Sequence, residues 1–189
     1  MSGYFTNAGA FLLDTLFSLY LFAVLLRFLL QAVRADFYNP VAHFIVVITN
    51  PPLKPLRRLI PGLYGIDLAS IVLLILIEAA YQLLHALLIN LPIDAAALTI
   101  LGFFHLAQAF LNIYFFGILI RVVLSWLNPY PNPLSQMLAR ITDPLLRPAR
   151  RLLPPYSGID FSPMIVMLGL VLVQMALPYL QRGALELLR

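Results

Sequence analysis

The chain has 189 residues, of which 62% are hydrophobic and only 11% are charged, with a formal net charge of +4. A soluble domain usually carries about 25% charged residues, so this chain has too little polar surface to cover a globule in water. The composition therefore excludes a water-soluble globular protein and indicates that lipid surrounds much of the chain. Cysteine is absent, which excludes disulfides, iron–sulfur clusters and thiolate catalysis.

Four segments are apolar and long enough to cross a bilayer as helices, which takes about 20 residues. In chain order these are residues 8–33, 67–90, 97–125 and 161–181. The first contains Asp14 and Arg27, and the second contains Glu78. Backbone groups in lipid must be hydrogen-bonded within the chain, so the sequence predicts an all-α membrane protein with four transmembrane helices.

The segment that follows the first span recurs 93 residues later. Residues 39–67 and 132–160 are identical at 14 of 29 positions, without a gap. Each unit is therefore a span, a loop and a span: residues 1–93 with loop 34–66, and residues 94–189 with loop 127–160. Since each unit crosses the membrane twice, the two tandem repeats are parallel and not inverted.

The repeated loop residues are candidates for a structural motif. In the first copy they are Asn39, Pro40, Pro51, Pro55, Pro61, Gly65 and Asp67, and in the second Asn132, Pro133, Pro144, Pro148, Pro154, Gly158 and Asp160. Each Asn-Pro pair is suited to open a helix. Each Gly-Ile-Asp block is suited to form a turn and the N-cap of the next span.

The residues after each Asn-Pro pair predict two short helices per loop. Residues 41–48 and 134–141 are too short to span, and the second segment has the spacing of an amphipathic helix, so we expect both to lie in the membrane interface. Residues 53–59 and 146–152 predict a second helix, separated from the first by prolines that cannot donate a backbone hydrogen bond. We expect Arg27 and Arg121, near the ends of their spans, to pair with the aspartates that open the next spans.

Ten of the twelve basic residues lie in or beside the two long loops. The amino-terminal segment and the turn between the units contain none. The positive-inside rule therefore predicts that both loops are cytoplasmic and that both termini lie outside the cytoplasm.

Part of this positive charge forms a repeated Lys/Arg-Pro-x-Arg-Arg motif, which is the first candidate for a binding surface. Its cations are Lys54, Arg57, Arg58, Arg147, Arg150 and Arg151. Each cation near an anionic leaflet contributes about 1 kcal/mol, so the motif could hold lipid headgroups or an acidic partner. Alternatively, these charges only set the topology, although that role does not require a repeated proline register.

Polar residues inside the second and third spans form the second candidate site. They are Glu78, Gln82 and His85 on one helix face, and His105, Gln108 and Asn112 on another. In a simple hairpin Glu78 faces Gln108, and Gln82 faces His105. These groups could hydrogen-bond the two helices together, or form a proton-linked path centred on Glu78. The equivalent of Glu78 in the second unit is Val171, which favours the structural role.

We expect no catalytic, cofactor-binding or metal-binding residues. His85 and His105 lie at different depths, which argues against a shared haem. The sequence has no phosphate-binding glycine loop and no zinc motif, and its basic loops lack the aromatic residues of a nucleic-acid groove. Four spans with little chain outside the membrane also leave few places for an active site, so the protein is not predicted to be an enzyme.

The repeated blocks, Asn-Pro, Ile-Thr-Asn/Asp-Pro-x-Leu-Lys/Arg-Pro-x-Arg-Arg-Leu-x-Pro and Gly-Ile-Asp, resemble the YggT (YlmG-like) family of small bacterial and plastid membrane proteins, in its two-repeat form. The resemblance implies a multi-pass protein of the bacterial inner membrane. It implies links to osmotic stress and ion homeostasis in bacteria, and to nucleoid organisation and cytochrome b6 maturation in plastids. No agreed biochemical activity comes with it.

Two functions follow from these features. The first is a non-enzymatic assembly, scaffolding or envelope-stress factor whose basic loops dock lipids or partner proteins. The alternative is a channel or transporter component in ion homeostasis or the osmotic response, which uses the Glu78-centred polar residues. The expected partners are anionic lipid headgroups at the cytoplasmic face, an unidentified membrane protein and a second copy of the chain, but not nucleic acid.

Overall fold

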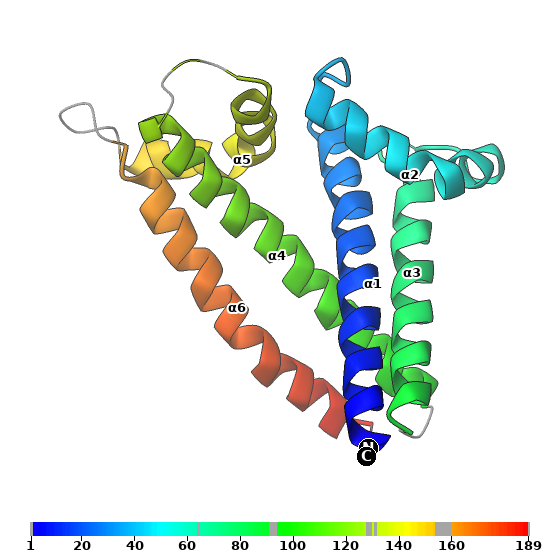
Figure 1. Ribbon diagram of the computed structural model, residues 1–189. Helices are drawn as coiled ribbons and strands as arrows, with labels where there is room; N and C mark the ends of the chain where they lie inside the picture. The colour runs from blue at the N-terminus through cyan, green and yellow to red at the C-terminus, as the bar shows by residue number, and fades with distance from the viewer. Residues whose placement is uncertain are drawn as a thin grey trace.

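The computed structural model describes residues 2–63, 65–90, 94–127, 130, 132–153 and 160–188, and in these residues it is helical without a β-strand (Figure 1). Its helices are α1 (Ser2–Ala32), α2 (Pro40–Leu59), α3 (Leu68–Leu88), α4 (Ala95–Leu127), α5 (Pro133–Leu152) and α6 (Ser162–Glu186). Helices α1, α3, α4 and α6 are long and apolar enough to cross a membrane. The predicted all-α membrane fold with four spans is confirmed.

The two units pack side by side. Figure 1 shows α1 and α3 upright, α4 and α6 running together at a slant, and α2 and α5 at one end of the spans. Within the units α1 packs on α3 and α4 on α6, and the units meet where α3 contacts α4 and where α2 contacts α5. Both chain ends lie at the end opposite α2 and α5. The two loop helices therefore share one side of the molecule.

Helices α1, α4 and α6 extend beyond the predicted apolar segments, whereas α3 lies within the predicted segment 67–90. Helix α1 begins at Ser2 and not at residue 8, and α6 ends at Glu186 and not at residue 181. Hydropathy identifies the part of a helix that matches the hydrocarbon layer, whereas backbone hydrogen bonds let the helix continue into the polar interface. The number and order of the spans are unchanged.

The loop helices correct one prediction. We predicted two short helices in each loop, but α2 and α5 are single helices of 20 residues. Helix α2 contains Pro51, Pro52 and Pro55, and α5 contains Pro144 and Pro148. A proline inside a helix removes one backbone hydrogen bond and kinks the helix, which can then continue in a new direction. In Figure 1 the two halves of α5 run in different directions.

Both loop helices begin at the predicted Asn-Pro pairs. The Oδ1 atom of Asn39 accepts a hydrogen bond from the N–H of Val41 (2.9 Å), and Pro40 is the first helical residue. The Oδ1 atom of Asn132 accepts from the N–H of Ser135 (2.8 Å), whose hydroxyl accepts from the N–H of Asn132 (3.0 Å). Such caps satisfy the free N–H groups of the first turn. The bounds of α5 are those of α2 displaced by the repeat offset.

The first loop ends in a turn at Gly65. Its φ of +83° lies in the left-handed region that favours glycine, and the backbones of Leu63 and Ile66 pair across the turn. In the second copy, Pro154 and Gly158 lie outside the described residues.

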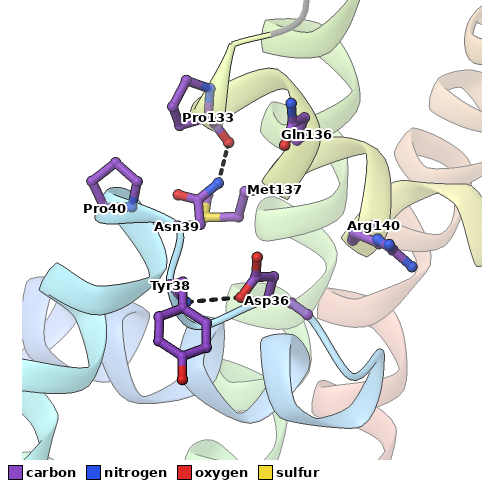
Figure 2. A pocket seen from close by; sticks show the side chains of 9 residues that line it. Asp36, Tyr38, Asn39, Pro40, Pro133, Gln136, Met137 and Arg140 are labelled. Atoms are coloured by element: carbon purple, nitrogen blue, oxygen red, sulfur yellow. Dashed lines mark hydrogen bonds between the residues drawn. The ribbon is translucent and has the colours of Figure 1, made fainter.

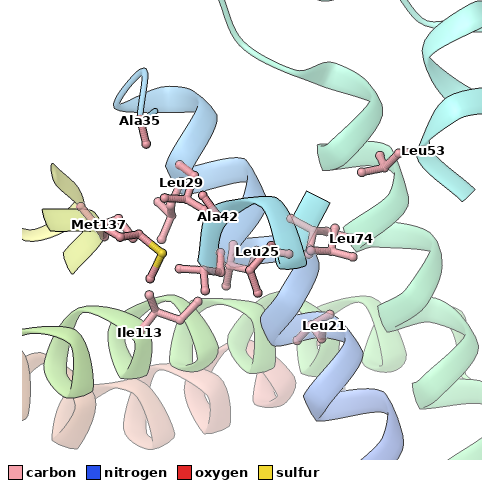
Figure 3. Packing of buried hydrophobic residues seen from close by; sticks show 14 of the residues in the cluster. Leu21, Leu25, Leu29, Ala35, Ala42, Leu53, Leu74, Ile113 and Met137 are labelled. Atoms are coloured by element: carbon pink, nitrogen blue, oxygen red, sulfur yellow. The ribbon is translucent and has the colours of Figure 1, made fainter. Parts of the chain in front are cut away.

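The main hydrophobic core lies near the loop end of the first unit and also includes residues of α4 and α5 from the second unit (Figure 3). Its members include Leu25 and Leu29 of α1, Ala42 and Leu53 of α2, Leu74 of α3, Ile113 of α4 and Met137 of α5. A smaller cluster of Ile118, Leu146 and Leu170 joins the three helices of the second unit. Leu53 and Leu146 are repeat equivalents and are both 0% exposed. Each loop helix is therefore anchored to its spans by a leucine at the same register.

We predict that Leu53→Ala lowers the free energy of unfolding by about 2–5 kcal/mol, because it leaves a cavity where α2 packs on the spans. Leu59, in the same helix, is 80% exposed, so Leu59→Ala is the matched control and should change stability little. The measurement is denaturant unfolding in detergent, followed by circular dichroism. Equal effects of the two substitutions would show that Leu53 does not anchor α2.

Candidate functional site

Arg27 of α1 is 3% exposed, so its positive charge is buried. Its Nη1 group donates hydrogen bonds to Thr49 Oγ1 (2.7 Å), Asn50 Oδ1 (2.8 Å) and the carbonyl of Val46 (3.0 Å), all in α2 just before its prolines. A buried charge requires such acceptors in place of water. We call Arg27, Val46, Thr49 and Asn50 the Arg27 cluster. It holds α2 against the end of α1.

The second unit repeats this arrangement. The Nη1 group of Arg121 donates to Thr142 Oγ1 (2.8 Å) and Asp143 Oδ1 (2.7 Å). We call these three residues the Arg121 cluster. Thr142 is the repeat equivalent of Thr49, whereas the neutral Asn50 is replaced by Asp143, whose carboxylate offsets the charge of the arginine. Both threonines belong to the repeated Ile-Thr-Asn/Asp-Pro block, but the repeat alone did not predict their hydrogen bonds to the span arginines.

These contacts correct the predicted pairing of the span arginines with Asp67 and Asp160. Both aspartates pair instead with arginines in the last turn of the loop helix: Arg57 with Asp67, and Arg150 Nε with Asp160 Oδ2 at 2.9 Å. The physical reason is position. The loop helix packs against both spans of its unit, so its last turn reaches the start of the next span. The same ion pair therefore closes the loop in both units.

Asp67 is buried and accepts hydrogen bonds from Arg57 and from the hydroxyl of Ser70. Burial alone would raise the pKa of Asp67, but the bonds from Arg57 and Ser70 stabilise the carboxylate and hold the pKa below its usual value. Asp67 occupies the N-cap position of α3, yet its side chain makes no capping hydrogen bond, so the prediction of a capping role is wrong. Its carboxylate joins α2 to α3.

Asp160 lies one residue before the N-cap position of α6, which Phe161 occupies. Its Oδ1 atom accepts a hydrogen bond from the N–H of Ser162 (2.9 Å). Burial would raise the pKa of Asp160, but hydrogen bonds from Ser162 and Arg150 outweigh burial and lower it. This carboxylate therefore holds both the start of α6 and the end of α5.

The six basic residues predicted as a binding surface fall into two groups. Arg57 and Arg150 are held in the ion pairs described above. The other four are exposed, and we call Lys54, Arg58, Arg147 and Arg151 the exposed basic set. The side chain of Arg147 is 73% exposed and 3.9 Å from Asp143, and the other three form no hydrogen bond or ion pair with the described part of the chain. The set is available to an external anion.

The loops of the two units meet at a polar cavity of about 300 Å³. In Figure 2 the amide of Asn39 donates to the carbonyl of Pro133 (2.6 Å), and Asp36 accepts from the N–H of Tyr38 (2.9 Å). Arg140 of α5 also lines this cavity. Asn39 thus caps α2 with its oxygen and joins the two units with its nitrogen. Only the first role was predictable, because the repeat register within one unit does not reveal contacts between units.

Within the spans, Glu78 is 4% exposed and lies at the centre of a polar cluster. Its Oε2 atom is 2.9 Å from His105 Nδ1, and its Oε1 atom accepts from Gln82 Nε2 at 2.7 Å. The ring of Tyr81 stacks on His105 with centroids 5.2 Å apart, and its hydroxyl donates to Asp14 at 2.9 Å. We call these five residues the Glu78 cluster. It links α1, α3 and α4 within the membrane.

The contacts of Glu78 differ from those expected for a simple hairpin. Glu78 meets His105 and not Gln108, because α4 is inclined to α3 and residues at equal distances from the turn no longer face each other (Figure 1). Gln108 donates instead to Asn112 (3.2 Å), which also accepts from Gln174 of α6 (3.1 Å). The predicted polar residues therefore form two groups, one around Glu78 and one around Asn112.

We predict that Asp67→Asn lowers the free energy of unfolding at neutral pH by roughly 1–3 kcal/mol, because it weakens charge-assisted hydrogen bonds from Arg57 and Ser70. The pKa of Asp67 is lower in the folded state than its unfolded value of about 4. The stabilisation is therefore present above that value and is lost as the pH falls through the lowered pKa. Unfolding midpoints measured against pH should converge for wild type and variant in acid.

The control for this experiment is Asp36→Asn, at an exposed aspartate outside the ion pairs. It should leave the unfolding midpoint nearly unchanged at every pH. A difference between wild type and Asp67→Asn that persisted undiminished into acid would contradict the assignment.

Comparisons with known proteins agree with this architecture. A family model described as CCB3/YggT matches residues 6–88 and 100–181. The uncharacterized protein PA0392 of Pseudomonas aeruginosa is 47% identical over 172 residues, which cover 89% of this chain and 87% of the relative. The uncharacterized protein YggT of Escherichia coli strain K12 is 38% identical over 170 residues, covering 89% and 88%. No solved structure matches the chain.

A plastid relative matches a shorter part. YlmG homolog protein 2, chloroplastic, of Arabidopsis thaliana is 38% identical over 61 residues, which cover 32% of this chain and 24% of the relative. The two segments matched by the family model each include a loop helix and its flanking spans, and together they account for most of the chain. The chain is a membrane protein and belongs to the CCB3/YggT family.

Proposed function

We propose that the chain is a non-enzymatic protein of the bacterial inner membrane that holds anionic lipid headgroups at the cytoplasmic face, in an assembly or envelope-stress role. The observation that supports this proposal is that the two arginines of each Arg-Arg pair have different roles. In both units the first arginine forms an ion pair with the aspartate that precedes the next span, whereas the second, Arg58 or Arg151, is exposed and unpaired within the described part of the chain. The first arginine already closes the loop, so the second is left for an external partner.

The position of the exposed basic set supports this proposal. Helices α2 and α5 lie at one end of the spans, which is where the membrane–water interface begins (Figure 1). Long basic side chains in that position can extend their charged groups to lipid phosphates. Each contributes about 1 kcal/mol near an anionic leaflet, and each unit supplies two of the four cations. An acidic surface on a membrane-protein partner offers the same chemistry.

An ion pathway centred on Glu78 is the alternative function, and it has less support. Glu78, Gln82 and His105 are hydrogen-bonded to one another. The last span carries Val171 at the position equivalent to Glu78, so the second unit has no matching acid there.

We predict that Arg58→Ala combined with Arg151→Ala weakens the binding of an anionic lipid by at least about tenfold, given about 1 kcal/mol for each cation. Native mass spectrometry can measure the binding of phosphatidylglycerol and of phosphatidylcholine to the purified protein in detergent. The double variant should lose the preference for phosphatidylglycerol. Higher ionic strength should weaken binding to the wild type more than to the variant, because salt screens exposed charges.

The matched control is Arg182→Ala, compared with each single substitution. Arg182 is exposed near the end of α6, at the end of the molecule opposite the loop helices, and its loss should leave the lipid preference unchanged. An unchanged preference in the double variant would reject the lipid proposal. If the double variant lost a co-purifying acidic protein in mild detergent and kept its lipid preference, the ligand of the exposed basic set would be that protein.

A further inference from the structure

A cavity of about 460 Å³ lies between α3 and α4, beside Glu78. Most of its walls are apolar: Ile75, Ala79, Ala95, Leu98, Gly102, Phe103 and Leu106. Ile75 and Phe103 are also exposed on membrane-spanning helices, so the cavity opens toward lipid. Its size and lining are typical of sites that take a small organic molecule.

The ionisable group in the lining of this cavity is an acid, Glu78. Among the residues that line it, Glu78 carries the one formal charge, and none is a lysine or arginine. His105 offsets that charge only while its ring is protonated. The next ionisable groups are Asp14, reached through Tyr81, and His85, whose ring lies 5.7 Å from the ring of Tyr81. Glu78 is therefore the group that an organic cation could use as a counter-ion, in competition with His105.

The hydrogen bond between Glu78 and His105 lies between this cavity and a second one. The second cavity, of about 430 Å³, is lined by His105 and by further polar residues of α3, α4 and α6: Tyr81, Gln82, His85, Gln108 and Gln181. Glu78 lines the apolar cavity and His105 lines the polar one. His105 thus lies on the far side of Glu78, whereas Gln82 lines both cavities, and the apolar walls are left to the hydrophobic part of a ligand.

Gly102 has no side chain, which leaves room for Glu78 at the wall of the apolar cavity. A Cβ atom at this position would be 2.9 Å from Glu78 Cγ, closer than real Cβ contacts. An alanine would therefore displace the Glu78 side chain while leaving its charge in place. Gly169 of α6 has no atom within 4 Å of an added Cβ and offers a matched glycine for comparison.

We propose that the apolar cavity binds an organic cation with a hydrophobic body, such as a quaternary ammonium or phosphonium compound, with Glu78 as its counter-ion. The ligand enters from the lipid between α3 and α4, and its body packs on the apolar walls. The exposed ring of Phe103 can contribute a cation–π contact. This site lies within the membrane, apart from the exposed basic set, and does not depend on the proposed lipid binding.

The first test compares two probes of nearly the same shape and opposite charge. Wild-type protein in phosphatidylcholine nanodiscs is dialysed against tetraphenylphosphonium or tetraphenylborate, with empty nanodiscs of the same lipid as background. We expect saturable binding of one tetraphenylphosphonium per chain, and binding of tetraphenylborate at least about tenfold weaker. Binding no higher than in empty nanodiscs, or equal binding of both probes, would overturn the proposal.

The second test uses variants whose folding is checked by their unfolding transitions. Glu78→Gln keeps the shape of the side chain and should weaken tetraphenylphosphonium binding at least about tenfold. Gly102→Ala should also weaken binding because it displaces the carboxylate, whereas Gly169→Ala should match the wild type. A folded Glu78→Gln variant that bound as tightly as wild type would refute the role of Glu78. If this variant did not fold, the two probes on wild type and Gly102→Ala would still decide the question.

Discussion

A guanidinium group remains charged at every physiological pH, so a buried arginine must be surrounded by acceptors. In this protein that requirement positions the loop helices. Arg27, which is buried, and Arg121, which is partly buried, lie near the ends of their spans, and each donates to a threonine of the following loop helix. With the loop helix held there, Leu53 or Leu146 is buried and the last turn meets the aspartate of the next span. The position of the exposed cations is a consequence of the same contacts.

The parts of the fold that depend on local chemistry were predictable from sequence. Hydropathy identified the spans because lipid requires a minimum apolar length, and the Asn-Pro pairs marked the first turns of α2 and α5. The continuation of these helices through Pro51 and Pro144 was not predictable in this way. A proline kinks a helix, but whether the chain then stays helical depends on packing on the far side of the kink. Here that side is anchored by Leu53 and Leu146.

The candidate sites, like the fold, could be predicted from the sequence only in part. Composition and spacing identified the basic motifs and the intramembrane polar residues, but not their partners. Which arginine of a pair is engaged depends on where the loop helix lies between two spans, and the partner of Glu78 depends on the inclination of α4. Both are tertiary properties. The repeat carried a partial signal, since Thr49 and Thr142 are identical and each lies one residue before the asparagine or aspartate that shares its arginine.

The fusion of two units in one chain permits an asymmetry that a symmetric dimer of single units would not allow. Such a dimer would contain two copies of Glu78, and each charged side chain at the bilayer centre costs about 2.5–3.5 kcal/mol on insertion scales. The fused chain instead carries Glu78 in one unit and Val171 in the other, while the loop helices keep matched bounds. Glu78 is therefore present once per molecule. The two units therefore share the bounds of their loop helices but differ in the polar residues within the membrane.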